Sequence, residues 1–149
     1  MASAEPNSDV TSKCKTRIWF AYSKDGGKTW QPAVKINDQS SLNDQFFPRL
    51  AVDDTTGNLM IVYYDTVADP GRLKTDVWMQ CSADNGNTWT NAVKITSAET
   101  DEATADDDLG NQYGDYIGLS GTAGNFFACW TDRRSGGNEQ IWGSAINFP

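Results

Sequence analysis

Arginines, carboxylates and one tyrosine supply the side chains of this sequence that are suited to contact a charged ligand. The candidates are Arg72, Asp115, Tyr116, Arg133 and Arg134. A guanidinium holds a carboxylate through paired hydrogen bonds, so Arg133 and Arg134 predict a clamp for an acidic group. The alternative interpretation is an ion pair of these arginines with Asp132 or Glu139, which would stabilise the loop. The sequence assigns no catalytic residue.

Histidine is absent, and its absence excludes several kinds of catalytic site. A chain without histidine has no imidazole acid–base group, no Ser-His-Asp triad and no histidine metal site. The run over residues 101–108 is rich in the oxygen ligands that calcium prefers. Its spacing matches no calcium loop, so we predict a solvated acidic loop and no cofactor, with Ca²⁺ as the alternative.

The net charge of −8 and the pI of about 4.3 argue against nucleic acid as a partner, because nucleic acid needs a lysine and arginine surface. No stretch approaches the ~20 apolar residues of a membrane span, and residues 1–15 are polar without a signal core. Three cysteines leave at least one free thiol in a monomer. Cys81 and Cys129 lie in strand-like runs that predict buried thiols, and pairing of Cys14 with either stays open.

The positioning elements emerge when the sequence is compared with itself. A shift of 59 places residues 16–36 on residues 75–95, with 11 of 21 positions identical. Each copy predicts a strand, a tight turn and a second strand. The shared turn residues are Ser23, Asp25, Gly27 and Trp30 in the first copy and Ser82, Asp84, Gly86 and Trp89 in the second.

These turn residues have a structural explanation that needs no ligand. The aspartates are expected to accept backbone N–H groups of the turn, and the serines to bridge back to it. Gly27 and Gly86 are expected to supply positive φ. Trp30 and Trp89 are expected to fold over the hairpin and bury a large apolar surface.

A second repeat lies between the two turns. A shift of 67 places residues 43–65 on residues 110–132, and each copy predicts two strands joined by a Gly-Asn turn. Joined with the first repeat, it gives a unit of four antiparallel strands. We count nine strands in groups of two, four and three, which predicts an all-β chain.

The Ser-x-Asp-x-Gly-x-Thr-Trp motif resembles that of the Asp-box, or BNR-repeat, proteins. Residues 43–53, 114–116 and 130–134 also resemble bacterial proteins of the exo-α-sialidase type. The resemblance implies a sialidase-like β-propeller of about two and a half blades. A polar N-terminal segment would cover residues 1–15 and the propeller segment residues 16–149. Within that segment we expect the end of one blade at 16–37, a full blade at 43–96 and three strands of the next at 111–149.

The strand order divides the loops between two faces of the propeller. The loops at 38–45, 65–76, 97–112 and 132–140 lie opposite the Asp-box turns, on the face that holds the candidate ligand-binding residues. Sialidases of this fold use three arginines, a tyrosine activated by glutamate and an aspartate. They also carry a Phe/Tyr-Arg-Ile-Pro motif, from which Phe47-Pro-Arg-Leu50 differs in order. No catalytic residue therefore carries over to this sequence.

The resemblance implies a carbohydrate-related segment of a sialidase-like glycoside hydrolase that is inactive alone. The alternative is a non-catalytic module that binds glycans or another protein. Glycans are the expected ligands, and the rest of a propeller or further copies of the chain are expected to cover the open blade edges. The expected location is secreted or on the surface of a bacterial cell.

Overall fold

The computed structural model describes residues 15–37, 39–101, 113, 116–134 and 138–148, and it contains strands and no helix within these ranges. The strands are β1 (Trp19–Phe20), β2 (Val34–Lys35), β3 (Gln45–Val52), β4 (Leu59–Asp65), β5 (Lys74–Ser82), β6 (Val93–Lys94), β7 (Thr100–Asp101), β8 (Gly118–Thr122), β9 (Asn125–Asp132) and β10 (Gln140–Asn147). The segment over residues 1–14 and most of the acidic run lie outside the described residues.

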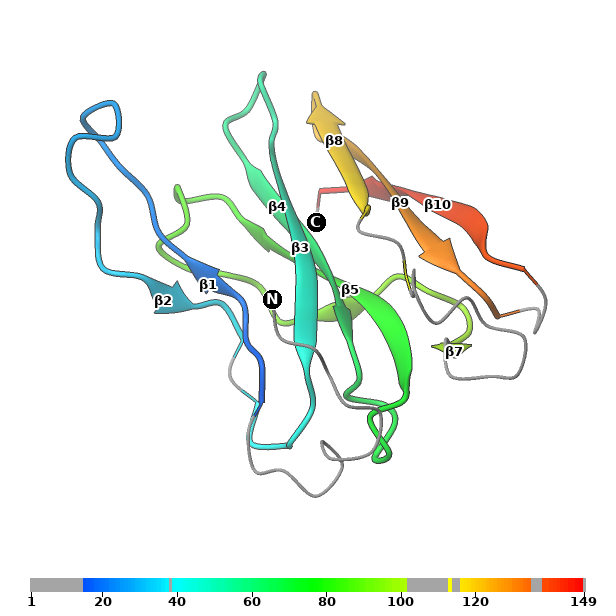
Figure 1. Cartoon of the computed structure of the whole chain (residues 1–149). Coiled ribbons are helices and arrows are strands. Elements are labelled where there is room, and N and C mark those ends of the chain that lie inside the picture. Colours follow the sequence, from blue (N-terminus) through cyan, green and yellow to red (C-terminus); the bar gives the residue numbers. More distant parts are fainter. Residues whose placement is uncertain (1–14, 38, 102–112, 114–115, 135–137, 149) are drawn as a thin grey trace.

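The strands form three antiparallel sheets of the predicted kind (Figure 1). β1 and β2 form the first sheet, β3 to β6 the middle sheet in sequential order, and β8 to β10 the third. The prediction of four-stranded antiparallel blades is confirmed by the middle sheet. The sequence did not predict β7, which pairs with the beginning of β5 through Thr75 and Thr100.

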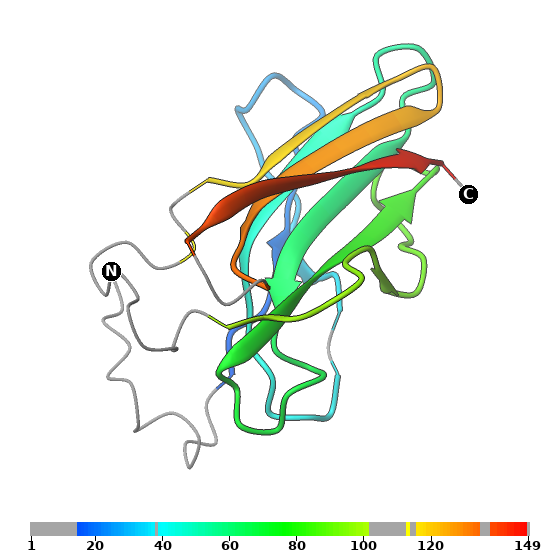
Figure 2. The same ribbon diagram turned by 90° about the vertical axis from the view of Figure 1, so that its right-hand side faces the viewer.

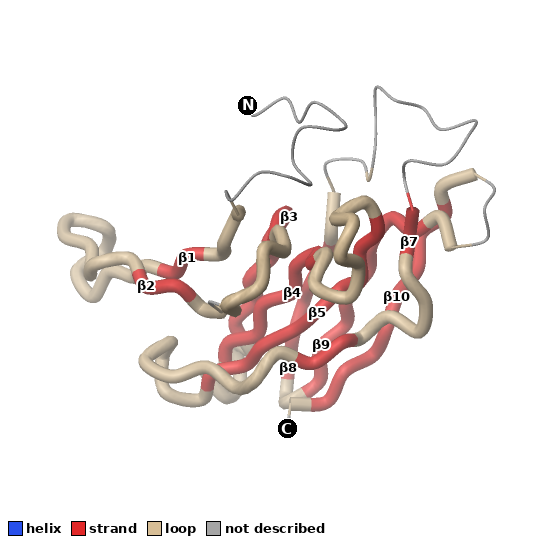
Figure 3. Tube along the Cα trace, turned by 90° about the horizontal axis from the view of Figure 1, so that it is seen from below, coloured by secondary structure: helices blue, strands red, loops and turns tan. Residues whose placement is uncertain are grey.

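The sheets lie side by side, with the first and the third at opposite ends (Figure 3). Figure 2 shows β9 and β10 crossing in front of the middle sheet, so the third sheet covers one of its faces. The middle sheet therefore has a neighbour on each side. Its strand β4 is buried along its whole length, which explains why Leu59–Asp65 is almost entirely apolar.

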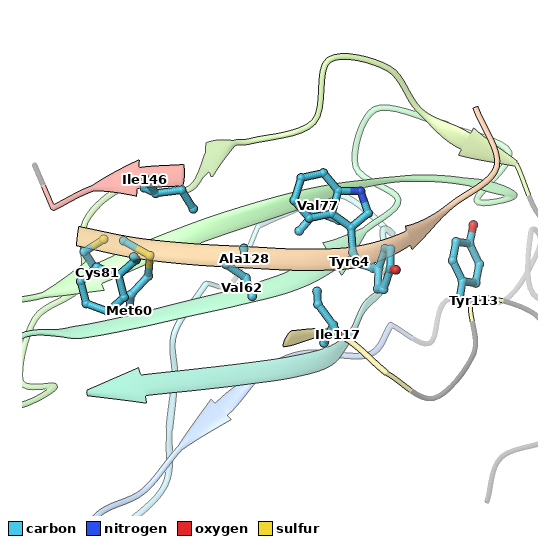
Figure 4. Packing of buried hydrophobic residues seen from close by; sticks show 11 residues of the cluster. Met60, Val62, Tyr64, Val77, Cys81, Tyr113, Ile117, Ala128 and Ile146 are labelled. Carbon is cyan, nitrogen blue, oxygen red and sulfur yellow. The ribbon is translucent and has the colours of Figure 1, made fainter. Parts of the chain in front are cut away.

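Successive residues of β4 point to opposite faces, and this alternation divides the core into two clusters. Met60, Val62 and Tyr64 pack with Phe126, Ala128 and Trp130 of the third sheet (Figure 4). Leu59, Ile61 and Tyr63 pack with Ile18, Phe20 and Ile36. These three belong to residues 15–37, which contain β1 and β2 and are called the first-sheet segment. One strand thus holds both neighbouring sheets.

Asp53, directly after β3, joins the middle sheet to the third. Its buried carboxylate accepts the backbone N–H groups of Thr55, Ala123 and Gly124 at 2.8, 3.0 and 2.5 Å. Burial works against ionisation, but the N–H donors outweigh it and lower the pKa of Asp53 to about 2. The turn between β8 and β9 is therefore held by a charge that belongs to the preceding sheet.

The Asp-box turns, residues 23–30 and 82–89, have the expected hydrogen bonds. Asp25 accepts the Thr29 N–H at 2.9 Å and its hydroxyl at 2.6 Å, and the Ser23 hydroxyl accepts the Gly27 N–H at 2.8 Å. The second turn repeats these contacts at Asp84. Gly27 and Gly86 have φ of +86° and +83°, as predicted.

The expected burial of Trp30 is wrong, because this side chain is 64% exposed. Trp89 is half-buried, and its ring packs edge-to-face on Phe20 of the first sheet, with ring centroids 5.3 Å apart. Trp89 thus finds its partner on the preceding sheet. Trp30 lies in the turn between the two strands of the first sheet, and the described residues place no sheet before that one.

Candidate functional site

The candidate site lies at the edge where β3 and β8 begin and β4 and β9 end. Antiparallel pairing brings these ends together, since Gln45 opposes Asp65. The loops 66–73 and 133–139 start at this edge, as the strand order predicts. Loops that are held by a rigid sheet are the usual position of binding residues.

Buried carboxylates form the base of this edge. Asp65 accepts hydrogen bonds from the Asn43 and Gln45 side chains at 2.6 and 3.0 Å and from the Val67 N–H at 2.8 Å. Its pKa is nevertheless raised, because burial outweighs these donors. Asp132, at the equivalent end of β9, is also buried and accepts the indole N–H of Trp130 at 3.1 Å. Both carboxylates are bonded within the fold.

The two adjacent arginines have different surroundings. The Arg134 guanidinium donates to Asp132 at 2.6 and 2.9 Å and to Ser97 Oγ at 2.6 Å. It also lies 4.1 Å from the centre of the Trp142 ring. Arg133 is 3% exposed, and its N–H donates to Thr100 Oγ1 at 2.7 Å. Arg134 is therefore paired with Asp132, as the alternative interpretation expected. A ligand clamp by Arg133 and Arg134 stays a prediction.

Arg72 is a further candidate, and its side chain is paired within the chain. Its guanidinium donates to the Asp44 carboxylate through Nε at 2.8 Å and also through Nη2. Asp44 also accepts the N–H and hydroxyl of Thr16 at 2.8 and 3.1 Å. This pair joins the β4–β5 loop to the beginning of β3 and to the first-sheet segment.

Tyr116 is the most exposed of the described candidates, at 78%, and Asp115 lies outside the described residues. Tyr116 precedes Ile117, whose carbonyl accepts Arg49 Nε at 2.7 Å. Under the 67-residue repeat, Arg49 of β3 and Tyr116 occupy the same position. The structure therefore places Arg49 of β3 against the backbone that directly precedes β8, one residue after its own repeat-equivalent.

Arg49 differs from the other arginines of this edge because its terminal nitrogens are available. The residue is exposed, and Nη1 and Nη2 make no hydrogen bond or ion pair with any described part of the chain. Arg49 was not among the predicted site residues, because Phe47-Pro-Arg-Leu50 differs in order from the sialidase motif. The 67-residue repeat contained a signal, because it makes Arg49 equivalent to the predicted site residue Tyr116.

Aromatic rings surround the beginning of β3. Phe46 stacks on Tyr64 with centroids 5.5 Å apart, and Tyr64 lies 5.0 Å from Tyr113. Figure 4 shows Tyr64, Ile117 and Tyr113 at one end of the core cluster, away from Cys81 and Met60. The Tyr64 hydroxyl donates to the Thr131 carbonyl at 2.8 Å, which fixes this ring between the two sheets.

Phe47 is the exposed member of this aromatic group. It is 37% exposed and has φ of +49°, at a register shift between Phe46 and Arg49. A bulky residue in the left-handed region is strained, and a bulge of this kind redirects a side chain away from the regular pleat. Strained positions concentrate at functional sites.

The site therefore offers an aromatic surface beside a guanidinium, an arrangement suited to binding a polar ring. Among the residues that the structure describes, no group of three carboxylates or thiols is placed to hold a metal ion. Among the described residues, no helix is long and apolar enough to span a membrane. Cys81 and Cys129 are free thiols, and burial raises the pKa of Cys81 to about 11.

Comparisons with known proteins identify the fold. No family model matches the sequence, and no curated protein matches it. Among solved structures, the chain is similar to the Hadza microbial sialidase Hz136, with a TM-score of 0.59, 15% identity, and coverage of 87% of this chain and 29% of the sialidase. It is also similar to the Penicillium chrysogenum α-L-arabinanase complexed with arabinobiose, with a TM-score of 0.57, 21% identity, and coverage of 89% and 38%.

These similarities define the class of fold to which the chain belongs. The chain folds as consecutive blades of a sialidase-like β-propeller, the architecture of these glycoside hydrolases. The predicted resemblance is confirmed at the level of the fold. The chain spans about a third of the length of the two solved structures.

Proposed function

We propose that this chain supplies a saccharide-binding surface of a carbohydrate-active β-propeller and is not catalytically complete alone. The observation that carries the proposal is the hydrogen bond from Arg49 to the Ile117 carbonyl, which holds this exposed arginine beside the segment that contains exposed Tyr116. Exposed Phe47 lies two residues before Arg49. An aromatic face packs against a sugar ring, and a guanidinium donates to its hydroxyl or carboxylate oxygens.

The engagement of the other arginines supports the part of the proposal that concerns catalysis. Arg72 and Arg134 are paired with Asp44 and Asp132, so each would have to leave its partner to hold a substrate carboxylate. Breaking a buried pair leaves a carboxylate without its charge partner, which costs about 3–5 kcal/mol. Arg49 carries no such cost. A site with one available guanidinium is suited to binding and is short of the three arginines that sialidases of this fold use.

A titration with 3′-sialyllactose and lactose tests this proposal. We expect binding by the whole chain, and we expect Arg49→Gln or Tyr116→Ala to weaken it at least tenfold, about 1.4 kcal/mol. Lys28→Gln, in the first Asp-box turn, is the control that should leave the affinity unchanged. Unchanged affinity in both site variants would remove this surface from the proposal.

Hydrolysis of a fluorogenic sialoside tests the catalytic part separately. We expect no turnover by the chain alone, since the guanidiniums of Arg72 and Arg134 are already paired. Measurable turnover that is lost in a paired Arg72→Lys and Arg134→Lys variant would contradict the statement that the chain is incomplete. We propose that such a protein acts outside a bacterial cell, where glycans are accessible.

A protein-interaction module is the second candidate function, and the apolar sheet surfaces favour it. Trp19 and Trp30 of the first-sheet segment are 59% and 64% exposed, and Phe127 and Ile141 of the third sheet are 53% and 75% exposed. Exposed apolar surface of this kind marks interaction sites. A solution mass above one chain, without binding of any glycan, would favour this function over the first.

A further inference from the structure

A cleft lies between the hairpin that joins β1 to β2 and the second Asp-box turn, on the sheets' other edge. It has a volume of about 290 Å³ and is lined by Phe20, Tyr22, Gln31, Pro32, Val34 and Asn87. Figure 1 shows this hairpin standing beside the middle sheet. The strand order places this hairpin cleft at the end opposite Arg49 and Tyr116, so it is separate from the surface of the proposed function.

The base of the hairpin cleft is aromatic. The Phe20 and Tyr22 rings have centroids 5.9 Å apart and planes 27° apart, so they form one continuous surface. Gly86 permits this arrangement because a Cβ at that position would lie 2.3 Å from the Phe20 ring. Trp89 packs edge-to-face on the same ring and fixes it from a second direction. The aromatic base is therefore held in place before any ligand arrives.

The rim of the hairpin cleft is polar and uncharged. The Gln31 side-chain amide makes no hydrogen bond within the described residues, while its backbone N–H is fixed on the Tyr22 carbonyl at 2.9 Å. Asn87 uses its Nδ2 on the Asp84 carbonyl, which leaves its Oδ1 as an acceptor. The Lys24 ammonium lies 5.5 Å from the centre of the Tyr22 ring and is not among the lining residues.

We infer that the hairpin cleft is a second binding site, and that its ligand is a neutral saccharide. The C–H face of a sugar ring packs on aromatic surface, and its hydroxyls both donate and accept, as amide groups do. An anionic ligand is disfavoured, because the lining holds no cation and the chain carries a net charge of −8. The volume is near the lower end for small-molecule pockets, ~300–1,000 Å³, so the site suits a short ligand.

Nuclear magnetic resonance of the ¹⁵N-labelled chain tests this site independently of the first one. Arabinobiose and cellobiose are the neutral probes, and glucuronate is the anionic probe. We expect the neutral sugars to shift the side-chain amide signals of Gln31 and Asn87, and glucuronate to leave them unchanged. Shifts confined to residues around Arg49 and Tyr116 would overturn the second site without touching the proposed function.

A filling variant and its repeat-equivalent provide the matched control. Val34 lines the cleft and is 49% exposed, while Val93 occupies the same position of the next blade and is 47% exposed. We expect Val34→Trp to weaken neutral-sugar binding at least tenfold and Val93→Trp to leave it unchanged. Gln31→Ala, at the exposed rim, should weaken binding without altering the fold. Equal effects of both tryptophan variants, or no binding by the unaltered chain, would overturn the inference.

Discussion

Gly27 and Gly86 occupy the same position of two Asp-box turns but have different surroundings. Both have positive φ, which costs an L-residue about 1–2 kcal/mol. A Cβ at Gly27 would meet nothing within 4 Å, whereas at Gly86 it would lie 2.3 Å from Phe20. We expect Gly27→Ala to lower the free energy of unfolding by about 1–2 kcal/mol, and Gly86→Ala by a further ~1–3 kcal/mol from overpacking.

Urea denaturation of the two alanine variants measures that difference. If both variants lose the same free energy of unfolding, the contact between Gly86 and Phe20 does not contribute to the packing of the first sheet on the middle sheet. That result would also contradict the statement that the aromatic base of the hairpin cleft is held in place by this contact. A larger loss in Gly86→Ala would show that one glycine serves the turn and the contact between two sheets together.

Acid should destabilise the fold through the Asp-box aspartates. The Thr29 hydroxyl and N–H and the Ser23 hydroxyl lower the pKa of Asp25 from 3.8 to about 2, and Asp84 has the same shift from Thr88 and Ser82. A lowered pKa contributes stability that is complete above pH ~4 and lost as the pH falls toward 2. The raised pKa of Asp65 acts in the opposite direction.

The urea midpoint between pH 5 and pH 2 tests this contribution. We expect the midpoint to fall with pH in the unaltered chain, and to fall less in the double variant Asp25→Asn with Asp84→Asn. The Asp65 term is present in both proteins and cancels in the comparison. An unchanged slope in the double variant would show that these carboxylates do not control acid unfolding.

At the scale of the element, β4 anchors a neighbouring sheet through each of two consecutive tyrosines. The Tyr64 hydroxyl donates to the Thr131 carbonyl of the third sheet at 2.8 Å. The Tyr63 hydroxyl donates to Gln80 Oε1 at 2.7 Å and accepts from Asn37 of the first-sheet segment at 3.3 Å. Because successive β4 residues face opposite ways, the two hydroxyls serve different sheets.

Replacing each tyrosine with phenylalanine separates the two anchors. We expect a loss of about 1–3 kcal/mol in each variant, since a buried partner is left without its hydrogen bond. Amide exchange should accelerate in the third sheet for Tyr64→Phe and near Asn37 for Tyr63→Phe. Acceleration in the same region for both variants would contradict the division of roles along β4.

At the scale of the whole molecule, the unequal size of the sheets explains the exposed apolar surface of β3. Leu50 and Val52 pair with Ile61 and Leu59 and share their face, yet they are 45% and 55% exposed. The first sheet has two strands, and its core cluster includes β4 and Trp78 of β5 without any residue of β3. The β3 side chains on this face therefore have no covering strand among the described residues.

Threonine substitutions test whether this face is open in solution. We expect Leu50→Thr with Val52→Thr to change the free energy of unfolding by less than about 1 kcal/mol. Ile61→Thr, 4% exposed on the same face, should cost more than about 2 kcal/mol. A large loss in the double variant, together with a lower solution mass, would show that another copy of the chain covers the face.

The repeats made the fold predictable because each repeat encodes its own hydrogen bonds. The Asp25 and Asp84 turns are closed by residues at most four positions apart, so the spacing fixes their geometry. The candidate site was less predictable. Whether Arg134 faces a ligand or Asp132 depends on loop geometry and not on residue type.

The sequence by itself determined the all-β class, the register of the two turns and the edge at which the candidate residues lie. Only the tertiary structure decided which aromatic and arginine side chains are available. Trp89 is covered and Trp30 exposed because burial depends on the neighbouring sheet. Arg49 donates to the Ile117 carbonyl, next to Tyr116, because β3 packs beside β8. Local hydrogen bonds can be read from spacing, whereas contacts between sheets depend on packing that spacing does not encode.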